Sequence, residues 1–398
     1  VSTMNPTWLL LLLPLAAASG WYAALRGSRS PRTVRSDIPQ AYIKSLNLLL
    51  NEQQDKALDV LISALETHEE TVEIQLALGN LFRRRGEIER ATQLHQNLIA
   101  RSGLEPDQRL LALYELGQDY YKAGLFDRAE SLLLEVAEAV EYSESAYRLL
   151  LQLYEQEKEW DNAIDSAKRL SEASGEDLTG LLAQYYCELA EERMASGMYQ
   201  ECAGFINQAL TSERNCTRAL MQSGRLRAIK NEHLLAIREW TKIVNLHPEM
   251  LTDVVGLVRQ SYQSLGRLSD YRKFLERCIE LNNDVRLMMT LVDLLIEIGQ
   301  PNQARNRLLT WMRNTDSLKS LTGLIESGTG DGFDYRSDRS LDFLIDLVSV
   351  LFGKTRSYEC RNCGFKGKSM HWQCPGCKNW NSTGPSRAAP LPTGKIDR

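Results

Sequence analysis

The chain has 398 residues, of which 43% are hydrophobic and 25% are charged, and its formal net charge is −5 at pH 7. This length exceeds one ordinary globular core, so several domains or an array of repeats are expected. The composition is too apolar for general disorder, and a mildly acidic chain lacks the basic surface that nucleic-acid binding usually requires. The composition therefore predicts a folded chain with no nucleic-acid partner.

The N-terminal segment runs from Trp8 to Leu25, 18 residues, without a charge. As a helix it would be about 27 Å long, against a bilayer core of about 30 Å. No basic residue precedes this run, whereas Arg26, Arg29, Arg32 and Arg35 follow it. Positive flanks stay in the cytoplasm. Residues 1–25 are therefore predicted to be a transmembrane anchor with an outward-facing N-terminus, and residues 26–37 a basic juxtamembrane linker.

A cleaved signal peptide is the alternative interpretation of this segment, because small residues occupy positions 16–19. Signal peptides carry their positive charge before the apolar stretch, and here it comes after. The order of charges favours an anchor, with the bulk of the chain on the cytoplasmic side of the membrane.

Apolar residues recur every three or four positions across residues 38–314, which predicts helices throughout. The same pattern begins at Gly79 and again at Gly117: an aromatic residue three positions on, a second glycine seven on and an alanine twelve on. The second glycine suits a left-handed helix end, and the alanine suits a close approach of two helices. Each unit is therefore predicted to be a helical hairpin.

Aligning the small residue of each second helix gives about eight hairpins with successive spacings of 34, 38, 34, 39, 34, 35 and 33 residues. The aligned positions are Ala57, Ala91, Ala129, Ala163, Cys202, Ala236, Tyr271 and Ala304. Tyr271 fits least well, and the first unit has Ser45 where glycine is usual. The period resembles the tetratricopeptide repeat, so the predicted fold class is all-α, a superhelical solenoid over residues 38–314.

By resemblance to tetratricopeptide repeats, the outward face of each first helix lines a concave groove that binds other proteins. In the second and third hairpins these positions are Asn80, Arg83, Arg84, Gln118, Tyr121 and Lys122. Each taken alone also fits an ordinary solvated helix position. As a group they are the predicted partner-binding surface.

Residues 315–355 contain a run rich in glycine and aspartate and then an apolar segment from about Leu341 to Leu351. They are predicted to form a loop followed by a capping helix. The tripeptide Gly353, Lys354 and Thr355 imitates the end of a phosphate loop, but the first glycine of that motif would fall at Val348, inside the predicted helix. This argues against a nucleotide site.

Four of the eight cysteines lie in two CxxC pairs within residues 356–381. They are Cys360, Cys363, Cys374 and Cys377. Two such pairs can surround one ion tetrahedrally, and the pattern resembles the rubredoxin-type metal fold. A closed set of four thiolates leaves no position for water and needs no redox chemistry, which favours one structural metal ion, zinc rather than iron, over a catalytic metal.

Structural roles can also be predicted for the residues around these cysteines. Gly364 and Gly376 are expected to relieve the two turns, and His371 to pack rather than to bind the metal. Four aromatic residues are expected to form an apolar skirt: Tyr358, Phe365, Trp372 and Trp380. The metal would supply the folding free energy of so small a knuckle, which is expected to dock on the last hairpins or to present a second contact surface. Residues 382–398 are predicted to be a disordered tail.

The remaining cysteines are scattered through helical sequence: Cys187, Cys202, Cys216 and Cys278. Disulfide-stapled domains are small and dense in cysteine throughout. A reducing compartment is therefore predicted for the main body.

The order of these parts, together with the phrases LLLNEQQDKALDVL, LGNLFRRRGEIERATQLHQNL and HWQCPGC, resembles the lipopolysaccharide assembly protein B family over nearly the whole chain. The resemblance implies an adaptor of the bacterial inner membrane, in Gram-negative bacteria, with a periplasmic N-terminus and a cytoplasmic main body, that limits lipopolysaccharide synthesis. It implies action with the protease FtsH to promote degradation of the deacetylase LpxC, and a part in assembling lipopolysaccharide synthesis and export proteins.

Two other classes of function stay open at this point. A general assembly scaffold of the cell envelope, with no part in proteolysis, fits the same repeats. An enzyme fits less well, because the chain has no nucleophile motif, no HExxH, no complete phosphate loop and no open metal site. A redox role for the cysteines would require iron. The prediction is a non-enzymatic adaptor, with homo-oligomerisation undecided.

Overall fold

The computed structural model describes residues 72–315 and 358–386, with scattered helical positions between 44 and 62 and between 341 and 349. The chain divides into two compact units, Val1–Tyr142 and Ser143–Arg398. Within the described part, no helix is long and apolar enough to cross a bilayer. The predicted anchor, the juxtamembrane linker and residues 387–398 lie outside the described residues.

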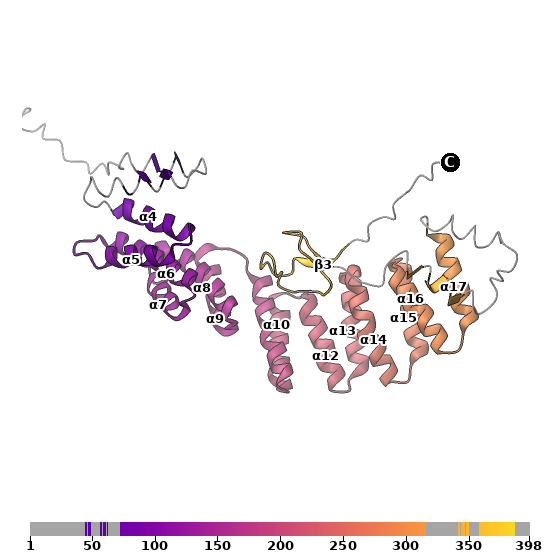
Figure 1. The fold of residues 1–398 in the computed structure, drawn as a ribbon. Coiled ribbons are helices and arrows are strands. Elements are labelled where there is room, and N and C mark those ends of the chain that lie inside the picture. Colours follow the sequence, from indigo (N-terminus) through magenta and orange to yellow (C-terminus); the bar gives the residue numbers. More distant parts are fainter. Residues whose placement is uncertain are drawn as a thin grey trace, which may run out of the picture. The chain divides into compact units, whose positions relative to one another are not determined.

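Consecutive helices form hairpins in both units (Figure 1). The first unit holds α4 (Val72–Arg84), α5 (Ile88–Ile99), α6 (Pro106–Ala123), α7 (Phe126–Ala137) and the start of α8 (Val140–Glu157). The second unit continues with α9 (Trp160–Ser174), α10 (Thr179–Ala195), α11 (Tyr199–Ser212), α12 (Thr217–Ile229), α13 (His233–Leu246), the 3-10 helix η2 (Pro248–Met250), α14 (Leu251–Ser264), α15 (Leu268–Leu281), α16 (Val285–Glu297) and α17 (Pro301–Asn314).

The aligned small residues of the eight predicted hairpins are all 0% exposed. Tyr271, which fits the repeat least well, is enclosed like the alanines, and its ring lies 6.4 Å from that of Phe274. Ser45, the exception in the first hairpin, is also buried. The tetratricopeptide-repeat fold is confirmed.

In each of the seven hairpins whose turns the structure describes, the turn contains one residue with a positive φ angle, five positions before the aligned small residue. These residues are Gly86, Gly124, Lys158, Gly197, Asn231, Gly266 and Gly299. The next residue bonds back to the helix that has just ended, as where Glu159 N donates to Tyr154 O at 2.9 Å. This left-handed helix end was predicted for the glycines; Lys158 and Asn231 adopt it with a side chain attached.

The earlier glycine of the repeat serves packing rather than the turn. A Cβ on Gly224 would lie 2.1 Å from Nε1 of Trp240, and a Cβ on Gly79 would lie 2.3 Å from Nε2 of His95. The second helix therefore places a ring in the space that the glycine leaves open.

First helices of successive hairpins contact one another, α4 with α6 in the first unit and α10 with α12 and α12 with α14 in the second. They form the first-helix layer of each unit. At the far end of the second unit, Leu341, Leu344 and Val348 are helical and buried in the same apolar cluster as Trp311 of α17. These three residues belong to the predicted capping helix, and Gly353 to Thr355 lie outside the described residues.

Candidate metal centre

A small antiparallel sheet frames the four cysteines. Its strands are β1 (Tyr358–Cys360), β2 (Lys366–Gly367) and β3 (Thr383–Pro385), in the order β2-β1-β3. β3 lies beyond residue 381, where the knuckle was predicted to end, because Thr383 pairs with Cys360 and the carbonyl of Ser382 accepts from Arg361 N at 2.8 Å. The folded knuckle therefore includes the start of the predicted tail.

The four sulfur atoms all lie within 4.8 Å of one another. Sγ of Cys360 is 3.7 Å from Sγ of Cys377, and Sγ of Cys363 is 3.6 Å from Sγ of Cys374. These separations are far longer than a disulfide bond of about 2.05 Å. They match a tetrahedron of thiolates about 2.3 Å from one ion, whose corners would be about 3.8 Å apart. The donor set fits a four-cysteine metal site of the rubredoxin type.

Two similar loops present the sulfurs in pairs. In the first, Cys360 N donates to Phe365 O at 2.8 Å and Gly364 N to Cys360 O at 3.0 Å. In the second, Cys374 N donates to Asn379 O and Lys378 N to Cys374 O, both at 2.9 Å. The shared pattern aims both thiols of each loop at one point.

The left-handed residues of these loops differ from the expectation. Gly364 has φ +74° as predicted, but in the second loop the left-handed residue is Lys378, with φ 59°, and not Gly376. Gly376 matters for space instead, because a Cβ there would approach Sγ of Cys363 to 3.4 Å and Cβ of Phe365 to 3.5 Å. The two loops thus pack against each other at Gly376.

Hydrogen bonds favour the charged form of two of the four thiols, whereas the pKa of Cys363, lowered by a hydrogen bond from the Phe365 backbone, is raised overall to about 12 by burial and the neighbouring thiols. The hydroxyl of Ser382, 3.3 Å from Sγ, lowers the pKa of Cys360 to about 6. The side chain of Asn362 lowers the pKa of Cys377. Thiolate is the form that binds metals. The ring of His371 lies edge-on to Phe365 at 6.3 Å, and its Nε2 is 3.1 Å from Oγ of Ser369, so it is placed for packing as expected.

The knuckle lies beside α10 and α12 of the second unit (Figure 1), and it is also bound by Glu155, near the end of α8. The Glu155 carboxylate accepts hydrogen bonds from Nε1 of Trp380 at 2.7 Å and Nε2 of Gln373 at 3.3 Å. It also accepts from the hydroxyl of Tyr185 in α10. Burial and this carboxylate raise the pKa of Tyr185, so the phenol stays a donor.

Further contacts join the knuckle to α9, α10 and α14. The ring of Trp380 packs edge-on against Trp160 and Tyr185, at 6.0 and 5.8 Å. The hydroxyl of Tyr358 lies 2.6 Å from Oδ1 of Asp253 in α14. One more aromatic residue of the knuckle, Trp372, packs against the apolar core of the second unit.

These contacts correct two expectations. Three of the four aromatic residues turn toward the repeats instead of forming a skirt around the metal site. The knuckle docks on α8, α10, α12 and α14, not on the last hairpins. Packing an aromatic ring against the repeats removes its apolar surface from water, which favours this arrangement.

The predicted partner-binding residues lie in the first unit and fall into two groups. Arg83 is held inside the first-helix layer, where its guanidinium pairs with Glu115 and with Asp119 at 2.7 Å. Burial opposes its charge, yet these carboxylates raise the pKa of Arg83. Asn80 accepts from Arg83 at 2.7 Å, and Gln118 donates to Glu115 at 3.1 Å.

The other three predicted residues face outward. Arg84 and Lys122 are exposed, and Tyr121 is half-buried, with the Lys122 ammonium 5.6 Å from its ring centre. These three form the accessible part of the predicted surface. The structure brings Asn80, Arg83 and Gln118 together in one hydrogen-bonded cluster with Glu115.

Sequence reasoning did not identify Asp119 and His95, whose side chains are 0% exposed and meet at 2.6 Å. The signal was a carboxylate and an imidazole on otherwise apolar helix faces, where buried polar groups need partners. It also did not identify Glu155, for which no local pattern exists, because its knuckle partner Trp380 is 225 residues away.

Comparisons with known proteins agree with both modules. A family model described as "Rubredoxin metal binding domain" matches residues 358–385, and one described as "Tetratricopeptide repeat" matches residues 114–177. Among solved structures, a tetratricopeptide repeat protein from Parabacteroides merdae is 13% identical, covers 65% of this chain and 99% of that one, and has a TM-score of 0.33, too low to carry an argument.

Curated relatives cover the whole arrangement. Lipopolysaccharide assembly protein B of Haemophilus influenzae is 29% identical, with 95% of this chain and 97% of that protein aligned. The protein of the same name from Escherichia coli K12 is 32% identical, with 95% of this chain and 98% of that protein aligned. Hairpins and knuckle are thus matched together, and this chain belongs to the lipopolysaccharide assembly protein B family.

Proposed function

We propose that this chain is a membrane-anchored adaptor, without a catalytic site of its own, that regulates lipopolysaccharide biosynthesis at the inner membrane. The observation that supports this most is the 32% identity to lipopolysaccharide assembly protein B across nearly the full length of both proteins. The four-cysteine site also fits, since four protein ligands close a metal to substrate.

The adaptor would promote degradation of the deacetylase LpxC by the membrane protease FtsH. Residues 1–25 would hold the cytoplasmic hairpins at the bilayer surface. Confinement beside a membrane protease raises the effective concentration of a captured client without any new contact. Arg84, Tyr121 and Lys122 would meet the partner, and the buried ion pairs of Arg83 would keep that surface rigid.

The metal would be a single structural zinc ion held by the four cysteines. Zinc commonly fills closed sites of four thiolates, and no redox step is asked of it. Elemental analysis of purified protein should find one zinc per chain in a colourless solution. A red, iron-containing protein would contradict this and favour the redox alternative.

Deleting residues 1–25 tests the adaptor function. Cells relying on the truncated chain at native expression should keep LpxC for longer, because the soluble hairpins no longer accumulate beside the protease. An unrelated transmembrane helix of the same orientation, fused in place of residues 1–25, should restore LpxC turnover. Normal LpxC half-life with the truncated chain would show that tethering is not the mechanism.

A general assembly scaffold for lipopolysaccharide export proteins is the second candidate, favoured by the word "assembly" in the relatives' names. The same deletion separates the two. A scaffold without a part in proteolysis leaves LpxC half-life unchanged while complexes of export proteins are lost.

A further inference from the structure

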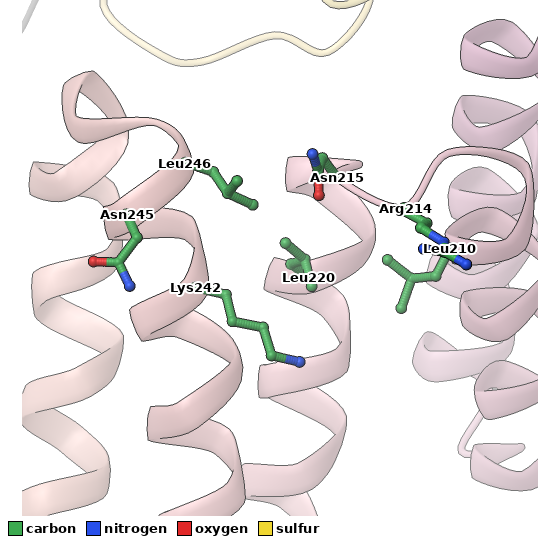
Figure 2. Close-up of a pocket in the computed structure, with 7 residues that line it drawn as sticks. All are labelled: Leu210, Arg214, Asn215, Leu220, Lys242, Asn245 and Leu246. Carbon is green, nitrogen blue, oxygen red and sulfur yellow. The ribbon is translucent and has the colours of Figure 1, made fainter.

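A surface trough of about 550 Å³ lies between neighbouring hairpins of the second unit. We call it the α11–α13 trough, and Figure 2 shows the side chains that line it. They come from the end of α11, the turn that follows, the first part of α12 and the end of α13. The lining residues are Leu210, Arg214, Asn215, Leu220, Lys242, Asn245 and Leu246.

The lining combines positive charge, amides and leucines, and it contains no carboxylate. Arg214 makes no ion pair within the described residues. Lys242 pairs at 2.7 Å with Glu239, a half-buried residue of its own helix, while the lysine side chain itself is 47% exposed. In a chain with a net charge of −5, this patch is a local site for negative charge.

The trough is open rather than enclosed. Leu220 is buried and forms the floor, whereas Arg214, Asn215, Lys242 and Leu246 are exposed around it. Sites for small molecules are concave and enclose most of the ligand. An apolar floor with a polar, exposed rim is instead the arrangement of a protein interface.

The docked knuckle contacts residues next to both sides of this trough. Arg218, in the first turn of α12, lies 5.9 Å from the Trp372 ring and pairs with Glu188 at 2.7 Å. β3 contacts η2, which directly follows α13, and Arg361 lies 3.8 Å from Glu249 in η2. A surface held in place before binding loses less free energy on ordering.

We propose that the α11–α13 trough binds an extended acidic segment of a partner polypeptide. One aliphatic side chain of that segment would lie over Leu220, and carboxylates on either side would meet Arg214 and Lys242. The amides of Asn215 and Asn245 each offer a donor and an acceptor to the segment's backbone. The inference rests on the proposed adaptor function and names the chemistry of what the adaptor captures.

The test measures binding of a fluorescein-labelled peptide, with one leucine between two pairs of aspartates, to the full-length protein by fluorescence anisotropy. Arg214→Gln combined with Lys242→Gln should raise Kd about fivefold to tenfold, since two attractive charges are lost. The matched control is Lys168→Gln combined with Arg169→Gln, which removes two exposed positive charges from α9. The control should leave Kd unchanged.

Leu246→Ser should also weaken binding, because it removes apolar rim surface without a change of charge. Equal weakening by the trough and control variants would overturn the proposal, as would equally tight binding of a peptide with lysines in place of the aspartates. Binding of phosphatidylglycerol vesicles that depends on Arg214 and Lys242, with no binding of the acidic peptide, would assign the trough to a lipid surface and overturn it too.

The outcomes for the trough and for the adaptor are separable. If the peptide does not bind while LpxC turnover still depends on residues 1–25, the trough proposal fails and the adaptor function stands. If the peptide binds as expected while LpxC turnover is indifferent to the anchor, the trough stands and the role in proteolysis fails.

Discussion

Lys158 occupies the left-handed position of its hairpin turn, which five of the seven equivalent positions fill with glycine. A side chain in this conformation costs roughly 1–2 kcal/mol, because Cβ crowds the following carbonyl. Lys158→Gly should therefore stabilise the second unit by about 1 kcal/mol and raise its thermal midpoint by about 2–4 °C.

Asn231→Gly is the matched comparison, since asparagine tolerates this backbone region better than lysine. It should give a smaller rise, measured by circular dichroism on both variants. A fall in the midpoint for Lys158→Gly would show that the lysine side chain contributes something that the turn geometry does not reveal.

Gly224 leaves room for the Trp240 ring, and the indole Nε1 donates to Met221 O at 3.2 Å. Gly224→Ala should push this ring away and destabilise the second unit by about 2 kcal/mol, as overpacking usually does. The control is Gly256→Ala in α14, where a Cβ meets nothing within 4 Å. That change should stabilise by about 0.5–1 kcal/mol because alanine favours helix. Equal thermal midpoints for the two variants would contradict the packing role of Gly224.

At the scale of elements, Glu155 is the carboxylate that holds the knuckle to α8 and α10. In Glu155→Gln only one side-chain oxygen remains to accept hydrogen bonds from three donors, Tyr185, Gln373 and Trp380. The new amide NH2 group is itself a donor and cannot accept from them. Losing hydrogen bonds to a charged group costs about 1.5–3 kcal/mol. Amide hydrogen exchange across residues 358–386 should therefore accelerate while metal content stays the same.

Glu172→Gln provides the control, because this glutamate is exposed on α9 and is not among the residues that bind the knuckle. Its exchange pattern should match that of the unaltered chain. Unchanged protection of the knuckle in Glu155→Gln would mean that the aromatic packing of Trp380 alone is sufficient.

The sequence could predict those elements whose residues repeat or cluster locally. The hairpin period follows from Ala91, Ala129 and their equivalents, because close helix packing demands a small side chain at a fixed place in each unit. The metal site follows from two CxxC pairs, because cysteines three positions apart can place their sulfurs on one ion. Both features can be recognised because each repeat unit and each CxxC pair occupies one continuous stretch of sequence.

The features that the sequence could not predict are contacts between distant residues and local backbone conformations that more than one residue could adopt. The docking of the knuckle on Glu155 joins residues more than 200 positions apart, and the separation leaves no pattern. In the second loop the left-handed residue is Lys378, four positions after Cys374, as Gly364 is four positions after Cys360, so the position follows the shared loop geometry and not the nearest glycine. The repeat pattern predicts Arg83 as a residue of the binding groove, and only the structure shows that it forms ion pairs with Glu115 and Asp119.

At the scale of the whole molecule, the knuckle connects hairpins that otherwise touch only their neighbours. Repeat arrays derive their cooperativity from contacts between adjacent units. Through Glu155, Arg218 and Asp253, the knuckle contacts α8, α12 and α14 together. Metal binding, worth on the order of 10 kcal/mol for small sites, therefore stabilises hairpins far from the cysteines in sequence.

Removing the metal with a strong chelator should unfold the knuckle and loosen the part of the second unit that it covers. Hydrogen exchange should accelerate in α8, α10, α12 and α14, while α4 to α7 keep their protection through the ion pairs of Arg83 and Asp119. Far-UV circular dichroism should change little, because the hairpins bury their own cores. Adding zinc back should restore the protection. Exchange that accelerates only within residues 358–386 would mean that the hairpins keep their arrangement without the knuckle, and that the knuckle does not stabilise them.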